Sequence, residues 1–286
     1  IVFQFSIYIF LIAATFIIQQ QLRFIQQKEM GYNREHVIVM GIDQKIIDKI
    51  DVFKSELKTN PNILAVSKAQ NTPVRIVGGY SMYRANQSET QSMSVKACPV
   101  DDEYIQVNSI EILAGTDLSK QDLLDANKED YTKNYFHYIL NESAIKALGW
   151  KLEEAIGKKM FMGSHRPGIV KAVIKDFHFA SLHTPIEPLI LFPGGWGNQL
   201  LAKVSGNQLT TVIPFLETKW KELAPHRPFE YHFMDEDFEK LYTAELKMGV
   251  VFNIFSGLAI LLACIGLFGL SAYSAQQRIK EIGVRK

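Results

Sequence analysis

The chain has 286 residues with 31 basic and 30 acidic side chains, so its formal net charge is +1. This balance argues against a nucleic-acid-binding protein, which presents a basic face to phosphates. The two cysteines, Cys98 in a polar region and Cys264 in an apolar one, are unsuited to pairing with each other. Mean hydropathy is near zero because two long apolar segments are averaged with a polar middle.

The N-terminal segment 1–18 carries no charge and is close to the minimum of about 20 residues that a helix needs to span a bilayer. Within the given residues it has no basic region and no small-residue cleavage site, so we expect a membrane span and not a signal peptide. We interpret it as a transmembrane helix whose start is truncated. The polar, helix-favouring residues that follow predict a stalk helix over 19–32, stopping at Gly31.

The polar middle, 33–234, predicts an extracytoplasmic α+β domain that is large enough for two subdomains. Apolar runs and alternation predict strands at 36–42, 63–69, 95–100, 110–113, 135–140, 159–161, 168–174, 189–192, 200–204 and 229–233. Helical spacing predicts helices at 45–58, 101–107, 142–148 (capped by Asn141) and 208–223. Residues 78–90 are predicted to be polar turns, and 120–133 a surface helix or loop.

After the middle, Asp235 can cap a second stalk helix over 235–248. An uncharged segment at 249–277 follows, which is long enough to span a membrane even when tilted. The final segment, 278–286, has Glu281 as its only acid among four basic residues. Excess lysine and arginine beside a span marks the cytoplasmic side, so the middle domain is predicted on the opposite, periplasmic side. Anchoring to lipid headgroups is the alternative role of these charges.

Within the second span, Gly257, Gly266 and Gly269 are predicted to allow close packing against other membrane helices. The alternative is that these glycines are only tolerated there. This hypothesis needs neighbouring spans, whether in this chain or in a partner.

Two groups of side chains are weighed as metal sites. His178 and His183 lie five residues apart, which fits neither a helical zinc pair nor a short zinc knuckle, even with Glu187 nearby. The acidic run 235–239 lacks the alternating ligands and the glycine of a calcium loop, and acids at a helix start have a simpler explanation in the helix dipole. We therefore predict no metal, no cofactor and no catalytic residues.

Several strings taken together resemble one known family. They are Gly31-Tyr32-Asn33, Asn141-Glu142-Ser143-Ala144, Leu148-Gly149-Trp150, Ile156-Gly157-Lys158, Lys175-Asp176-Phe177-His178-Phe179, Ser181-Leu182-His183, Pro228-Phe229-Glu230-Tyr231, Met234-Asp235-Glu236-Asp237-Phe238, Leu241-Tyr242, Gly266-Leu267-Phe268-Gly269-Leu270 and the terminal stretch from Gln277 to Lys286. Their order and spacing resemble an FtsX-like ABC transporter permease with a MacB-type periplasmic core domain. Gly115-Thr116-Asp117-Leu118 departs from the pattern, which often has an arginine and a phenylalanine there.

The resemblance implies a multi-pass inner-membrane protein, and implies that this chain is a fragment, the second module of a double-module permease. It implies a cytoplasmic ABC ATPase as partner, a second permease module or copy, membrane lipid, and a periplasmic adaptor or lipoprotein. It also implies that ATP-driven motion reaches the periplasmic domain for efflux, lipoprotein handling or cell-envelope work. The chain has no phosphate-binding loop of the G-x-x-x-x-G-K-[ST] type, in agreement with a separate ATPase.

The amphipathic basic end is the natural docking element for such an ATPase. We assign the coupling hypothesis to Arg278, Lys280, Glu281 and Arg285. The alternative function is a two-span membrane sensor receptor whose outer domain binds a ligand. The two functions predict different continuations beyond Lys286: further spans for a permease, and a soluble signalling segment for a receptor.

Overall fold

The structure is a computed structural model that describes the backbone of residues 2–284 and the side chains of 6–206 and 208–276. The chain divides into two compact units. One unit contains the two long terminal helices, that is, the chain up to Lys28 and from Leu241 onward. The other is the central domain, Glu29–Lys240.

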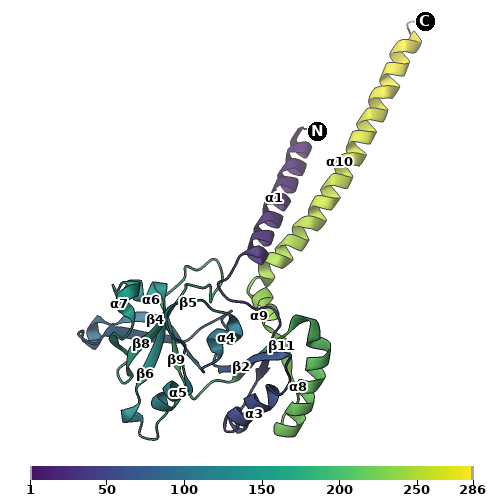
Figure 1. The fold of residues 1–286 in the computed structure, drawn as a ribbon. Coiled ribbons are helices and arrows are strands. Elements are labelled where there is room, and N and C mark those ends of the chain that lie inside the picture. Colours follow the sequence, from purple (N-terminus) through teal and green to yellow (C-terminus); the bar gives the residue numbers. More distant parts are fainter. Residues whose placement is uncertain (1, 285–286) are drawn as a thin grey trace. The chain divides into compact units, whose positions relative to one another are not determined.

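The terminal unit consists of α1 (Val2–Gln27) and α10 (Thr243–Val284), which pack side by side (Figure 1). Each contains a stretch apolar and long enough to cross a membrane, Ser6–Gln27 and Thr243–Gln276. Most side chains of these stretches are exposed, as expected of surfaces that face lipid and not of core helices.

The stalks differ from the sequence prediction at both ends of the central domain. The first stalk, predicted over 19–32, is helical only to Gln27, and Gly31 lies in the loop beyond it. The second, predicted over 235–248, is broken at Tyr242 between α9 (Met234–Leu241) and α10. Polar residues favoured helix in both regions, but contacts made by residues 30–33 and by α9 within the central domain determine where regular helix stops.

One lobe of the central domain is a four-stranded antiparallel sheet in the order β11-β1-β10-β2. The strands are β1 (Val37–Gly41), β2 (Ile63–Ala69), β10 (Gln199–Val204) and β11 (Tyr231–Phe233). Helices connect β1 to β2 and β10 to β11: α2 (Gln44–Ile47), α3 (Ile50–Leu57) and α8 (Leu209–Leu223). This order is that of a ferredoxin-like split βαβ fold. We call it the helix-covered lobe, residues 33–69 and 199–233.

The core of the helix-covered lobe forms where the apolar faces of α3 and α8 meet the sheet (Figure 1). The Phe53 ring packs edge-on against Trp220, with centroids 5.6 Å apart, and both side chains are buried. The helix predicted over 45–58 is divided into α2 and α3. Asp43 caps α2 by accepting a hydrogen bond from the Ile46 backbone N–H.

The second lobe is inserted between β2 and β10. Its strands are neighbours in the spatial order β4, β3, β7, β8, β6 and β9. Because β9 also pairs with β4, the strands close into a barrel. Their bounds are β3 (Gly79–Arg84), β4 (Met93–Val100), β6 (Phe136–Asn141), β7 (Lys159–Met162), β8 (Pro167–Ile174) and β9 (Leu189–Pro193). We call it the barrel lobe, residues 70–198.

The barrel lobe has its own hydrophobic core, distinct from that of the helix-covered lobe. Two cores in one domain confirm the predicted α+β domain with two subdomains. One strand was missed, because residues 78–90 were predicted to be polar turns. β3 forms there because it pairs with strands on both sides, and its Tyr83 ring stacks on Phe161 at 5.2 Å.

The remaining elements connect or cover these sheets. They are α4 (Tyr104–Asn108), β5 (Ile112–Gly115), α5 (Lys120–Ala126), α6 (Glu142–Ala147), α7 (Leu152–Ala155) and 3₁₀ turns at Glu89–Gln91, Tyr131–Lys133 and Gly206–Gln208. The predicted cap of α6 is confirmed: the Asn141 side chain accepts a hydrogen bond from the Ala144 N–H at 2.9 Å.

Candidate functional site at the ends of the central domain

The sheet register places the two ends of the central domain beside each other. β1 and β11 are antiparallel neighbours, and Ile38 near the start of β1 pairs with Phe233 at the end of β11. The segment that leads into β1 and the helix that follows β11 therefore lie at the same end of these two strands. The two ends of the central domain are therefore neighbours in the sheet.

A side-chain contact ties these two ends together. Arg34 Nε lies 3.1 Å from Asp235 Oδ1, and the Arg34 guanidinium carbon lies 3.7 Å from the centroid of the Phe238 ring. Phe238 is only 4% exposed. We call Arg34, Asp235 and Phe238 the end clamp. An ion pair combined with cation–π stacking holds a guanidinium in one orientation better than either contact alone.

The electrostatics of the end clamp are those of a partly buried pair. Burial raises the pKa of Asp235 above its ordinary value, and the attraction of Arg34 offsets only part of this effect. Next to it, burial also acts on Asp237, but the hydrogen bond and charge of His232 outweigh burial and lower the pKa of Asp237. His232 Nε2 lies 2.9 Å from Asp237 Oδ2.

The acidic run weighed as a calcium site therefore has partners within the protein. In addition to the contacts of Asp235 and Asp237, the Glu236 carboxylate accepts the Phe233 N–H at 3.1 Å. These acids bind the start of α9 to the end of β11. Among the residues that the structure describes, no group of three or more metal-ligating side chains occurs.

The incoming segment is held by a second set of contacts. The Met30 carbonyl accepts the His178 N–H at 2.8 Å, and the Asn33 N–H donates to the Asn108 carbonyl at 2.8 Å. Gly31 has a φ of +87°, and a Cβ at this position would lie 2.7 Å from Phe177 Cβ. Both facts require glycine. The next ring, Tyr32, packs edge-on against Phe177 at 5.9 Å.

These contacts continue into the barrel lobe. Asp176 accepts hydrogen bonds from the Ser143 N–H at 3.0 Å and the Ser143 hydroxyl at 2.7 Å. In return, the Asp176 N–H donates to Glu142 Oε2 at 2.9 Å. Asn141 also accepts the Leu189 N–H at 2.8 Å. A hydrogen-bonded path thus runs from the incoming segment to the start of α6 and on to β9.

Sequence reasoning did not identify this path as a site. Apart from Met30, Asn108 and Leu189, its residues belong to three of the strings that carry the family resemblance, those beginning at Gly31, Asn141 and Lys175. The strings were separate in the sequence, and only the fold shows that they bond to one another. His178 and His183, considered as metal ligands, use their backbone N–H groups here, for Met30 and for Ser181.

A buried charge network lies where the two lobes meet. Asp101, at the end of β4 and 5% exposed, accepts from Lys54 Nζ at 2.7 Å, Ser67 Oγ at 2.6 Å and the Lys68 N–H at 2.7 Å. Lys68 Nζ donates to the Gly195 carbonyl at 2.6 Å, on the segment that returns from β9 to β10. The network therefore joins α3 and β2 to the residue after β4 and to the segment between β9 and β10.

The pKa shifts of Lys54 and Glu103 favour their charged forms, whereas burial lowers the pKa of Lys68. Burial alone lowers the pKa of Lys54, but the neighbouring charge of Asp101 outweighs burial and the pKa is raised. Burial raises the pKa of Glu103, but hydrogen bonds and charge from Lys58 and Lys54 outweigh this effect and the pKa is lowered. Both groups are held in their charged forms.

In the terminal unit, small and polar residues make the contact between α1 and α10. The Thr15 hydroxyl lies 2.8 Å from the Leu11 carbonyl and 3.3 Å from the Phe252 carbonyl, and Gln19 Nε2 donates to Asn253 Oδ1 at 2.6 Å. A Cβ on Gly249 would lie 2.6 Å from Leu22 Cδ1. Gly249 is thus a packing glycine that sequence analysis missed.

The glycines that were predicted to pack are placed differently. A Cβ on Gly257 or Gly269 would meet nothing within 4 Å, so these positions are open in this chain. Gly266 is half-buried. Packing at Gly257 and Gly269 would need helices other than α1 and α10, and packing at all three glycines stays a prediction.

The predicted coupling residues lie at the end of α10 or beyond it. Arg278, Lys280 and Glu281 are part of the helix, but their side chains are outside the described residues, as is Arg285 altogether. Their role stays a prediction. Cys98 and Cys264 are both free, as the sequence indicated.

One solved structure, the first of the three described here, confirms the predicted fold. The periplasmic region of MacB from Actinobacillus actinomycetemcomitans aligns over 76% of this chain and 96% of its own, with 15% identity and a TM-score of 0.50. The extracellular domain of the ABC-type transporter YknZ from Gram-positive bacteria aligns over 69% and 98%, with 11% identity and a TM-score of 0.46. A permease-protein domain from Porphyromonas gingivalis aligns over 69% and 89%, with 13% identity and a TM-score of 0.41.

No protein-family model matches the chain, and no curated protein matches it. The likeness to the MacB region concerns the fold. The central domain therefore has the fold of the MacB periplasmic region, and an apolar helix long enough to cross a membrane lies at each end of the chain.

Proposed function

We propose that the chain is part of a non-catalytic permease subunit of an FtsX/MacB-type ABC transporter. Its central domain is periplasmic, α1 and α10 cross the inner membrane, and a separate cytoplasmic ATPase supplies the energy. The observation that carries the proposal is the geometry of the ends: a domain with the MacB fold is bonded across its two ends by Arg34 and Asp235, and both ends continue into apolar helices.

This arrangement supports mechanical transmission. The segments between the helices and the sheet are short, and they are hydrogen-bonded to the domain at Met30 and Asn33 and through α9. A flexible linker would absorb a displacement of the membrane helices, whereas these contacts pass it to both lobes.

The proposal places the basic end of α10 at the cytoplasmic face, where Arg278, Lys280, Glu281 and Arg285 contact the ATPase. Lysine and arginine excess beside a span supports this orientation. A second permease module or copy would cover the open glycine face, and a periplasmic adaptor or lipoprotein would contact the central domain.

The test uses the full-length protein, co-expressed with a candidate ABC ATPase from the same genome and reconstituted in proteoliposomes. We expect the two to co-purify, and charge reversal by Arg278→Glu together with Glu281→Arg to abolish the stimulation of ATP hydrolysis. Arg75→Glu, at an exposed position of the central domain, is the matched control and leaves stimulation unchanged. A protein that binds no ATPase and carries a soluble signalling segment after Lys286 would contradict the proposal and favour the sensor receptor.

A further inference from the structure

One end of the barrel lobe is hollowed into a pocket of about 580 Å³. Its walls come from the end of α5, the loop before β6, the turn between β7 and β8, and the segment after β9. The register places the starts of β6 and β8 and the ends of β7 and β9 at this mouth. Barrel mouths are common ligand sites, and the volume lies in the usual range for small-molecule pockets.

Arg166 is the central cation of the pocket. Its guanidinium carbon lies 5.4 Å from the Tyr80 ring centroid and 5.7 Å from the Trp196 ring centroid. Both rings pack edge-on against the buried Phe192, at 5.9 and 5.8 Å. The Arg166 backbone is fixed as well, because its carbonyl accepts the Tyr138 hydroxyl at 2.6 Å. The guanidinium is thus held in place by aromatic faces.

Its charge has no partner of opposite sign. Among the described residues, Arg166 makes no ion pair, and none of the side chains that line the pocket is acidic. Lys128 at the rim is already bonded to Asp125 at 3.4 Å, and Ser164 donates to Glu89 at 2.6 Å. A fixed, planar guanidinium without a carboxylate is preorganised for a carboxylate or phosphate.

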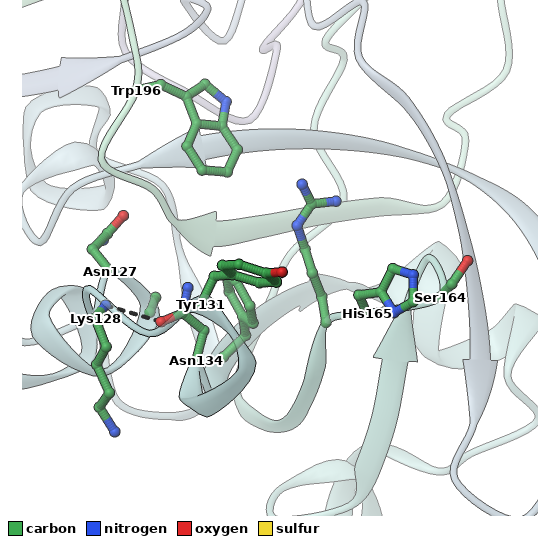
Figure 2. Close-up of a pocket in the computed structure, with 10 residues that line it drawn as sticks. Asn127, Lys128, Tyr131, Asn134, Ser164, His165 and Trp196 are labelled. Atoms are coloured by element: carbon green, nitrogen blue, oxygen red, sulfur yellow. Dashed lines mark hydrogen bonds between the residues drawn. The ribbon is translucent and has the colours of Figure 1, made fainter.

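The pocket also offers exposed aromatic surface. Tyr131 is 77% exposed and Trp196 is 42% exposed, which is unusual for side chains of this size. Figure 2 shows Trp196, Tyr131 and His165 around the hollow. Asn127 holds the Trp196 segment in position, since its side chain accepts the Gly195 N–H at 2.9 Å. Apolar faces beside one cation are suited to a ligand that has both an apolar body and a negative charge.

We propose that the barrel mouth binds an amphiphilic anion: an aromatic or otherwise apolar molecule that carries a carboxylate or a phosphate. The anionic group pairs with Arg166, and the apolar body stacks on Trp196 and Tyr131. This inference concerns a binding site of the barrel lobe, and it holds whether or not an ATPase drives the protein.

The test is calorimetric titration of the full chain in lipid nanodiscs, with empty nanodiscs as the blank. The probes are 2-naphthoate and 2-naphthyl phosphate, compared with the neutral 2-naphthylmethanol and the cationic 2-naphthylmethylamine. We expect saturable binding of the anions with a Kd of about 10 µM to 1 mM, the range set by ligands of this size. The tighter of the two anions identifies the natural headgroup as carboxylate or phosphate.

Two pocket variants and one control make the result specific. Arg166→Gln keeps the backbone contacts and should weaken anion binding about 10- to 100-fold, as expected for the loss of a charge-assisted hydrogen bond. Arg166→Lys keeps the positive charge but lacks the planar guanidinium. Its affinity for the anions should lie between that of wild type and that of Arg166→Gln. Arg75→Gln removes an exposed arginine that does not line the pocket and should bind as wild type.

Three results would overturn the proposal. They are neutral 2-naphthylmethanol binding as tightly as the anions, Arg166→Gln binding them unchanged, and the absence of saturable anion binding at millimolar concentration. Thermal melting of each variant shows that it is folded, so that weaker binding is not mistaken for unfolding.

Discussion

Asp101 shows how much one buried carboxylate can support. It accepts hydrogen bonds from Lys54, Ser67 and Lys68, and its removal would leave the Lys54 ammonium buried with weaker partners. We predict that Asp101→Asn lowers the free energy of unfolding by about 2–3 kcal/mol. Urea denaturation followed by circular dichroism measures this. Lys133→Gln, which breaks an exposed pair with Asp130, is the control and costs less than about 0.5 kcal/mol.

The network also predicts a response to acid. The folded-state pKa of Glu103 lies below its ordinary value of 4.5, so its contribution to stability is complete above that value and is lost as the pH falls through the folded pKa. We expect the melting temperature to fall in this acid range, and Glu103→Gln to show a smaller fall than wild type. If the melting temperatures of wild type and Glu103→Gln fell equally with decreasing pH, Glu103 would not be the source of this acid sensitivity.

The pKa of Asp117 is shifted in the opposite direction from that of Glu103. Burial raises its pKa to about 6 from the ordinary 3.8, so the folded state binds more protons than the unfolded state between these values. Stability therefore decreases as the pH rises from 3.8 to 6, and the penalty persists above that. Asp117→Asn keeps the acceptor for the Leu118 N–H.

From this sign we predict that Asp117→Asn raises the melting temperature at pH 7. After allowance for partial solvent exposure, a gain of ~1 kcal/mol corresponds to about 2–4 °C in a domain of this size. At acidic pH, below the ordinary pKa of aspartate, the two proteins should melt together. A variant that melts lower than wild type at pH 7 would show that the charged form is the stabilising one.

Local pattern was enough to locate most elements of the central domain. The strands at 63–69 and 200–204 and the Asn141 cap were predicted closely, because alternation and capping are properties of neighbouring residues. β3 was missed because its stability comes from pairing with β4 and β7, which lie elsewhere in the sequence. The helix breaks at Gln27 and Tyr242 were missed for a related reason, since contacts outside the helix define them.

The candidate site was predictable only in its parts. Arg34, Asp235 and the strings at Gly31, Asn141 and Lys175 could all be read from the sequence, but their mutual contacts depend on the β1–β11 register and on the closure of the barrel. No local signal specifies which strand neighbours which. The glycines illustrate the same limit: Gly249 packs against Leu22, whereas Gly257, in the same helix, is open.

This difference between glycines gives a test for the helix pair. Gly249→Leu would place side-chain atoms into the space of Leu22, and overpacking of this kind costs about 1–3 kcal/mol. The readout is disulfide formation between cysteines replacing Gln19 and Asn253, in a Cys264→Ser background. We expect Gly249→Leu to reduce cross-linking about 10-fold. Gly269→Leu is the matched control and should leave cross-linking unchanged. Equal reductions by Gly249→Leu and Gly269→Leu would contradict the close packing of Gly249 against Leu22.

The central domain as a unit is organised around its two ends. The end clamp, the path from Met30 to α6 and the network at Asp101 connect both lobes to the segments that continue into α1 and α10. We predict that Asp235→Arg uncouples the domain from its helices while the fold is retained. The double variant Arg34→Glu with Asp235→Arg restores the ion pair in reverse and should recover part of the function, measured as ATP hydrolysis stimulated by the permease. No recovery in the double variant would assign the loss to something other than the pair.

The most direct test of this account measures motion across the protein. Spin labels on the two lobes, for example at Leu64 of β2 and Leu124 of α5, which are exposed, report the distance between the lobes by pulsed electron resonance. The sample is the full-length protein in nanodiscs together with the ABC ATPase that the proposed function requires. We predict that trapping the ATPase with ATP and vanadate shifts this distance, and that Asp235→Arg removes the shift. An identical distance with and without ATP in the intact complex would contradict the claim that the clamped ends transmit motion to the domain.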